Sequence, residues 1–131
     1  MRPDIFVELL RSGQIEKFNS VRPSVLDLRW QDLSGSDLRG VNFVGADLRK
    51  TNLADCNLSG ARLRGALLDF AHLGRAKLCD ADLYRASLEK ADLSGADLRG
   101  ALLDEALFSG ALCVNMLRLP NRHKSPANIA R

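Results

Sequence analysis

The sequence predicts an all-β fold, a quadrilateral parallel β-helix of about 4.5 coils that carries a short N-terminal helical cap. Residues 26–115 divide without insertion into 18 units of five residues. The third residue of a unit is Leu in 15 units, and the first residue is Ala in 12. Eight of the ten Gly residues end a unit. Such a short, uninterrupted period is typical of a solenoid, whose coils pack only on their neighbours.

The period of five excludes a helix and a continuous strand, although Leu and Ala both favour helices. Five residues advance an α-helix by about 500°, so the Leu residues would spiral around it and form no apolar stripe. Side chains alternate along a strand with a period of two, so each unit would turn its Leu to the other face. The chain must therefore turn once per unit, with the first and third residues facing inward.

Four units make one coil in this interpretation, because residues 20 positions apart then share their character. The column Trp30, Lys50, Phe70 and Lys90 alternates aromatic rings and cations, and it is a candidate surface ladder held by cation–π contacts. Three further pairs at this spacing have opposite charge and support the same register: Arg49 with Asp69, Arg62 with Asp82, and Lys77 with Asp97.

The two ends of the repeat define the predicted domains. Residues 1–25 form an N-terminal helical cap, with a helix over 3–12 that ends at Gly13 and a second turn that directs Ile15 and Phe18 inward. Residues 26–115 form the β-helix. Residues 116–131 form a C-terminal cap and a basic mobile tail.

The last coil departs from the repeat, because apolar residues occupy positions that should be polar and outward-facing. These residues are a candidate protein interface. Two interpretations stay open: the tail folds back over them, or a twofold homodimer packs its C-terminal coils together. The identity of any other protein partner is unknown. The candidate interface consists of Leu67, Leu102, Leu107, Leu112, Val114, Met116 and Leu117.

The sequence contains no pattern typical of an active site, so we expect no enzyme, no catalytic or cofactor-binding residue and no metal site. His72 and Cys79 are interpreted as outward surface residues, while Cys56 and Cys113 face inward as small apolar residues. The apolar runs are too short for a membrane span, and the first residues do not form a secretory signal. We therefore expect a cytoplasmic protein.

Units such as Ala46-Asp47-Leu48-Arg49-Lys50 resemble the repeats of pentapeptide-repeat proteins, and the resemblance covers about 90 residues. The units at 91–95 and 96–100 have the same form. The resemblance implies a right-handed coil with four repeats per turn. It also implies a non-enzymatic scaffold or protein–protein interaction module.

Some members of that family imitate duplex DNA and protect or inhibit type II topoisomerases such as DNA gyrase. Such mimicry requires a strongly negative surface, because the site it occupies binds phosphates. Here residues 26–115 hold thirteen acidic against eleven basic residues, a net charge of −2. Residues 1–25 add +1 and residues 116–131 add +4, which brings the whole chain to +3. This balance disfavours DNA mimicry, which remains the alternative function. Four basic residues in the tail, without interleaved aromatic residues, are weak support for binding nucleic acid: Arg118, Arg122, Lys124 and Arg131.

Overall fold

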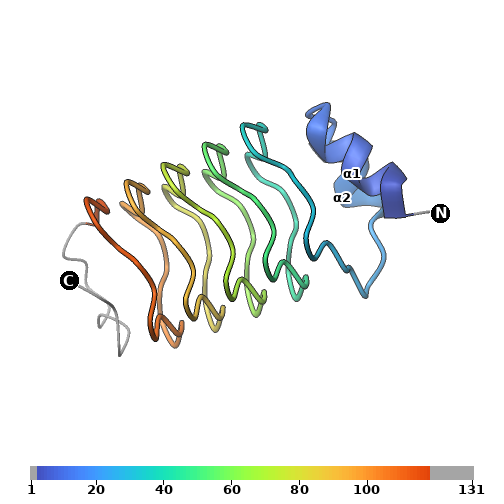
Figure 1. Cartoon of the computed structure of the whole chain (residues 1–131). Coiled ribbons are helices and arrows are strands. Elements are labelled where there is room, and N and C mark those ends of the chain that lie inside the picture. The colour runs from blue at the N-terminus through green and yellow to red at the C-terminus, as the bar shows by residue number, and fades with distance from the viewer. Residues whose placement is uncertain (1–2, 119–131) are drawn as a thin grey trace.

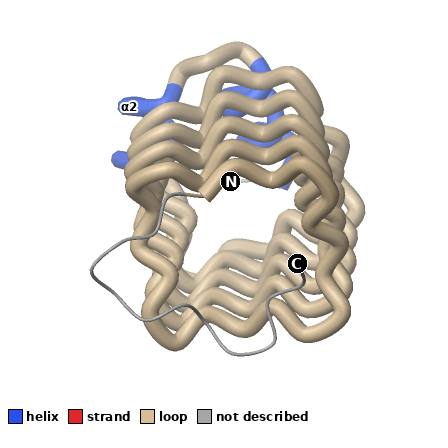
Figure 2. The backbone as a smooth tube through the Cα atoms, turned by 90° about the vertical axis from the view of Figure 1, so that its left-hand side faces the viewer, coloured by secondary structure: helices blue, strands red, loops and turns tan. Residues whose placement is uncertain are grey.

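The computed structural model describes residues 3–118, which form a single stack of coils with two helices at the N-terminal end (Figure 1). Seen along the stack, each coil has four sides (Figure 2). The inward first and third residues of the units make one continuous core along the stack. Ala46, Leu48 and Leu78, for example, are completely buried.

Neighbouring coils pair in parallel through residues that lie 20 positions apart, such as Asp27 with Asp47 and Asp97 with Leu117. Each side of a coil contributes one bridge, at the second residue of its unit. The Asp47 N–H donates to the Leu26 carbonyl, and the Asp47 carbonyl accepts from the Leu28 N–H. Within the described residues these bridges stay isolated and do not extend into longer strands, because the chain turns again after every fifth residue.

Each turn places the fifth residue of a unit in the left-handed region, with φ between 58° and 77° in all 18 units. The N–H of the next residue then donates to the carbonyl of the unit centre, as in the 3.2 Å bond from Gln31 to Leu28. A positive φ at the third turn position is the signature of a type II turn, which favours Gly there. Ten fifth residues are not Gly, and eight of these contact the same corner of an adjacent coil: Trp30, Lys50, Phe70, Lys90, Asp55, Arg75, Arg85 and Glu105.

Two helices cover the first coil: α1 over Pro3–Arg11 and α2 over Ile15–Val21. Gly13, with φ of 77°, separates them. Phe18 of α2 is fully buried, and its ring meets Phe6 and Phe43 edge-on at centroid distances of 6.3 and 5.8 Å. The core of the solenoid therefore continues without interruption into the helices.

Side chains of the helical segment also replace the hydrogen bonds that an earlier coil would supply. Asn19 accepts the Asn42 N–H through Oδ1 at 2.8 Å and donates Nδ2 to the Gly40 carbonyl. The Arg22 guanidinium donates to the Asn42 and Val44 carbonyls at 2.9 and 3.1 Å. Arg11 donates Nε to the Asp32 carbonyl at 2.8 Å. These bonds satisfy part of the open edge, which would otherwise remain free to pair.

At the other end the pairing continues past residue 115. The Leu117 N–H donates to the Ala96 carbonyl, and the Leu117 carbonyl accepts from the Leu98 N–H. Residues 116–118 are therefore part of the coil and not of a separate tail. The predicted tail over 119–131, including Arg122, Lys124 and Arg131, lies outside the described residues.

Candidate interaction surfaces

In ten of the 18 units the second residue braces the corner that follows it. Where this residue is Asp or Asn, its Oδ1 accepts the backbone N–H two residues later, as in the 3.1 Å bond from Arg29 to Asp27. This side-chain turn fixes the backbone at the corner. Sequence reasoning treated these residues only as polar surface positions. All ten of them make the bond: Asp27, Asp32, Asp37, Asn42, Asp47, Asn52, Asn57, Asp82, Asp92 and Asp97.

In four units the same carboxylate also binds an Arg two residues later through two parallel bonds. Asp47 receives Arg49 Nε at 2.8 Å and Nη2 at 2.7 Å. In the equivalent pair, the hydrogen bond from the Arg29 side chain lowers the pKa of Asp27 to about 2. The ion pairs thus differ from those predicted between coils: Arg49 pairs with Asp47, Asp82 receives Arg64, and Asp97 receives Arg99. These pairs neutralise much of the surface locally.

The four residues of the predicted ladder come together along one edge of the stack, which we call the Trp–Lys corner (Trp30, Lys50, Phe70, Lys90). Lys50 Nζ lies 4.5 Å from the centroid of the Trp30 ring and 5.8 Å from that of Phe70. Lys90 Nζ lies 5.5 Å from the Phe70 centroid. Trp30 remains 71% exposed and Phe70 48% exposed. The corner is therefore an ordered and accessible row of rings and ammonium groups.

The C-terminal leucines surround the last coil instead of forming one flat patch. Leu102, Leu107, Leu112 and Leu117 pair with Asp82, Ser87, Asp92 and Asp97, one on each side of the coil, and we call them the leucine belt. They are between 38% and 57% exposed.

The remaining candidate interface residues have different positions. Val114 is exposed and follows Leu112 in the same unit, while Leu67 lies two coils earlier in the column of Leu107. Met116 is partly buried and packs against the core. The sequence placed it in the candidate interface, but it does not belong to the exposed surface.

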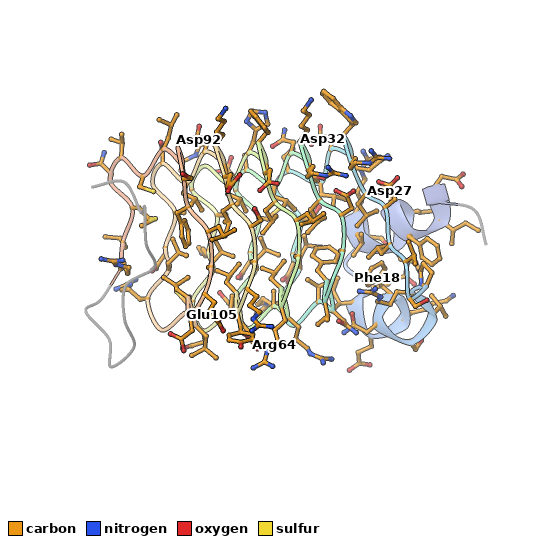
Figure 3. All side chains as sticks on the ribbon, turned by 90° about the horizontal axis from the view of Figure 1, so that it is seen from below. Phe18, Asp27, Asp32, Arg64, Asp92 and Glu105 are labelled. Atoms are coloured by element: carbon orange, nitrogen blue, oxygen red, sulfur yellow. The ribbon has the colours of Figure 1, made fainter. Side chains whose placement is uncertain are left out.

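A cluster that sequence reasoning missed surrounds Tyr84. The guanidinium carbons of Arg64 and Arg85 lie 4.9 and 5.3 Å from the centroid of its ring. Arg85 binds Glu105 at 3.3 Å, and a hydrogen bond with Glu105 raises the pKa of Tyr84. Figure 3 shows Arg64 and Glu105 on the opposite side of the stack from Asp32 and Asp92. The 20-residue spacing of Arg64 and Tyr84, and of Arg85 and Glu105, is a signal that could have revealed the cluster.

The family model for pentapeptide repeats matches eight copies, over residues 27–60, 56–95 and 91–112. The chain belongs to the pentapeptide-repeat family. Structures of this family are right-handed β-helical solenoids, in agreement with the parallel pairing seen here. The resemblance inferred from the repeats is thus confirmed. Among curated proteins, no match is found.

Three solved structures illustrate the similarity of this pentapeptide-repeat protein to others. HetL, involved in heterocyst differentiation regulation in the cyanobacterium Nostoc sp. strain PCC 7120, is 37% identical with a TM-score of 0.65, over 66% of this chain and 40% of HetL. A protein from the Arabidopsis thaliana thylakoid lumen is 34% identical with a TM-score of 0.64, over 66% of this chain and 60% of that one. A third, from Nostoc PCC 7120, is 24% identical with a TM-score of 0.62, over 91% of this chain and 100% of that one.

Two of the three cysteines of this pentapeptide-repeat protein have raised pKa values. Burial raises the pKa of Cys56 to about 11. Burial and a hydrogen bond with Asp97 also raise the pKa of Cys79, so its reactive thiolate is disfavoured. His72 is exposed beside Asp92, whose pKa is lowered mainly by the backbone N–H of Ser94 and less by His72.

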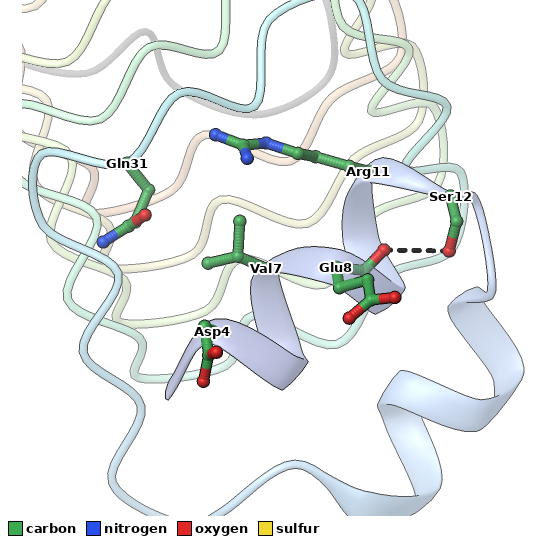
Figure 4. A pocket seen from close by; sticks show the side chains of 6 residues that line it. All are labelled: Asp4, Val7, Glu8, Arg11, Ser12 and Gln31. Carbon is green, nitrogen blue, oxygen red and sulfur yellow. Dashed lines mark hydrogen bonds between the residues drawn. The ribbon is translucent and has the colours of Figure 1, made fainter. Parts of the chain in front are cut away.

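An open groove of about 430 Å³ lies between α1 and the first coil (Figure 4). Its lining includes Glu8, Arg11 and Ser12. Arg11 Nε already binds the Asp32 carbonyl, and Ser12 Oγ donates to the Glu8 carbonyl at 2.8 Å. The Arg11 bond attaches α1 to the coil, and the Ser12 bond closes the C-terminal turn of α1. Neither helix of the described chain is long and apolar enough to cross a bilayer.

Proposed function

We propose that this chain is a non-enzymatic protein-binding scaffold, and that the leucine belt is the surface through which a second copy of the chain binds. One observation carries the proposal: at the second position of the last coil, all four sides present Leu where the residues they pair with are Asp, Ser, Asp and Asp. A ring of apolar side chains at the end of a stack is the surface expected to associate.

A twofold arrangement supports this choice of occupant. In a stack, each second residue lies beside the second residues of the coils above and below it. A second copy placed end to end would bring its own leucines beside those of the first, so that the same residues serve on both partners. The last described coil would be covered at the same time.

Sedimentation equilibrium tests the proposal. We expect a concentration-dependent dimer for the native chain and a monomer for the double variant Leu107→Asp and Leu112→Asp. The matched control, Asn57→Asp with Asn52→Asp, adds the same two charges at second positions of earlier coils and should still dimerise. A native chain that stays monomeric at high concentration overturns the dimer. Affinity capture from the native cell, with the same variants, then tests whether the belt binds a different protein.

DNA mimicry toward a type II topoisomerase receives less support. Seven arginines of the repeats form ion pairs on the surface, so the carboxylates do not add up to a phosphate-like row. A gyrase supercoiling assay, with and without a fluoroquinolone, checks this alternative; protection at excess protein would favour it over the scaffold.

A further inference from the structure

The lysines of the Trp–Lys corner differ from seven of the eight arginines at 26–115, which form ion pairs with carboxylates. No carboxylate among residues 3–118 forms an ion pair with Lys50 or Lys90, whose ammonium groups are held by aromatic rings. The corner thus presents two positioned cations that have unused hydrogen-bonding capacity. The paired arginines are Arg29, Arg39, Arg49, Arg64, Arg75, Arg85 and Arg99.

The exposed rings make the corner suitable for binding a protein. Large aromatic side chains are enriched at the energetic centres of interfaces. Trp30 and Phe70 are already ordered by the lysines between them, so less conformational freedom is lost on binding. Lys50 lies over both rings, and Lys90 lies over Phe70. This arrangement hinders the stacking of nucleobases on the rings.

We infer that the Trp–Lys corner docks an amphipathic α-helix of a partner protein, with alternating apolar and acidic residues along one face. Successive corner residues lie one coil apart, about 4.8 Å. An α-helix advances about 5.4 Å per turn and departs from the coil spacing by only about 2 Å over three steps, so one face can match all four positions. A strand presents side chains to one face about every 6.8 Å and falls out of step by about 6 Å over the same length. The acidic residues of the helix meet Lys50 and Lys90, and its apolar residues meet the rings.

Charges beside the corner restrict the partner further. Asp69 and Glu89 precede Phe70 and Lys90 in the sequence. Asp69 accepts hydrogen bonds from the Ser87 hydroxyl and the Glu89 N–H, and its charge also acts on Arg49. These carboxylates repel a uniformly negative polymer such as single-stranded nucleic acid. They favour a helix whose acidic line is bordered by Arg or Lys.

The inference rests on the proposed protein-binding role but uses a surface separate from the leucine belt. Trp30 is the only Trp of the chain, so its fluorescence reports on the corner. The probe is a stapled helical peptide of about 18 residues without Trp. It carries Leu, Glu, Leu and Glu at three- to four-residue spacing, bordered by Arg. The control peptide has Gln in place of each Glu, and an oligothymidylate is titrated in parallel.

We expect a saturable change in Trp30 fluorescence with the Glu peptide, and at least about tenfold weaker binding by Lys50→Gln with Lys90→Gln. Lys77→Gln with Arg62→Gln, which removes two cations elsewhere, should bind normally. Far-UV circular dichroism verifies that the variants are folded. Equal binding of the Glu and Gln peptides, no saturation at about 1 mM, or tighter binding of the oligonucleotide overturns the inference. Dimerisation through the leucine belt is measured separately, so either proposal can fail while the other holds.

Discussion

At the scale of single residues, the Asp or Asn that precedes the centre in ten of the units has two separable tasks. Its Oδ1 holds the backbone N–H at the corner, and in four units its carboxylate also binds an Arg. Asn performs the first task and not the second, as Asn52 and Asn57 demonstrate. The extra hydrogen bond at these ten corners therefore requires an acceptor oxygen and not a negative charge.

Asp47 allows the two tasks to be measured apart. We expect Asp47→Ala to lower the free energy of unfolding by about 1 kcal/mol, because the Arg49 N–H loses its acceptor, as at an uncapped helix start. Asp47→Asn should lower it by clearly less, because Oδ1 remains. Urea denaturation of both variants measures the difference. Equal losses would show that the charge and not the acceptor matters.

The lowered pKa values predict how stability responds to acid. The pKa of Asp27 falls from 3.8 to about 2 on folding, and that of Asp97 is also lowered, chiefly by hydrogen bonds from Arg side chains. A carboxyl whose pKa falls on folding contributes stability that is complete above its unfolded pKa and is lost as the pH falls through its folded pKa.

We expect the melting temperature to be nearly constant from about pH 7 to 5 and to decrease between about pH 4 and 2. The double variant Asp27→Asn with Asp97→Asn should decrease less steeply across the lower range, because it has two fewer groups that gain a proton on unfolding. Thermal scans at several pH values provide the measurement. Parallel curves for the two proteins would contradict this origin of the pH dependence.

At the scale of elements, α2 completes the core as well as covering the first coil. Phe18 is fully buried between Phe6 of α1 and Phe43 of the first coil. Phe18→Ala should reduce the free energy of unfolding by about 3–5 kcal/mol, because it removes a large ring and leaves a cavity at the junction. The exposed neighbour Lys17→Ala is the control and should change little. Denaturant titration of both checks the expectation, and a loss below about 1 kcal/mol would mean that the helices are not coupled to the solenoid.

The repeats made it possible to predict the solenoid and the residues of each unit that point into its core, because a period of five permits few other arrangements. The ion pairs were less predictable. A register of 20 residues places Arg49 near Asp69, but the flexible Arg side chain reaches Asp47 in its own unit with better two-bond geometry. The first helix was anticipated from Gly13 and the apolar spacing, whereas the segment 14–19 was predicted only as a second turn and forms the helix α2 over Ile15–Val21. The bonds of Asn19 and Arg22 to the first coil depend on three-dimensional placement.

At the scale of the whole molecule, stability depends on a core that is one side chain thick. Leu78 is completely buried in the middle of the stack. Leu78→Asp should unfold or fray the chain, because a charge buried there has no partner and no water. Asn57→Asp, at an outward position one coil earlier, should leave the fold intact. Circular dichroism and thermal melting distinguish the two, and a folded Leu78→Asp protein of normal stability would contradict the description of the core.

The arrangement of the candidate interface residues could be understood only from the four-sided coil. In the sequence, the C-terminal leucines read as one apolar region. The coil distributes them over four sides, and it turns Met116 into the core because that residue begins a unit. The Trp–Lys corner was predictable, since its four residues recur at one spacing. The cluster around Tyr84 combines two columns of the same 20-residue spacing, so its signal is divided between them.

Because every coil uses the same 20-residue register, the length of the molecule can change while its width stays constant. A gene segment encoding one coil could be duplicated or lost, and the neighbouring coils would still find partners at the same height. Each such event changes the length by about 4.8 Å and leaves the cross-section unaltered. Where Asp and Arg pair within a single unit, as Asp47 and Arg49 do, gain or loss of a coil also leaves neither charge without its partner. This chain can thus vary in reach during evolution while the two ends that bear its cap and its leucine belt are inherited unchanged.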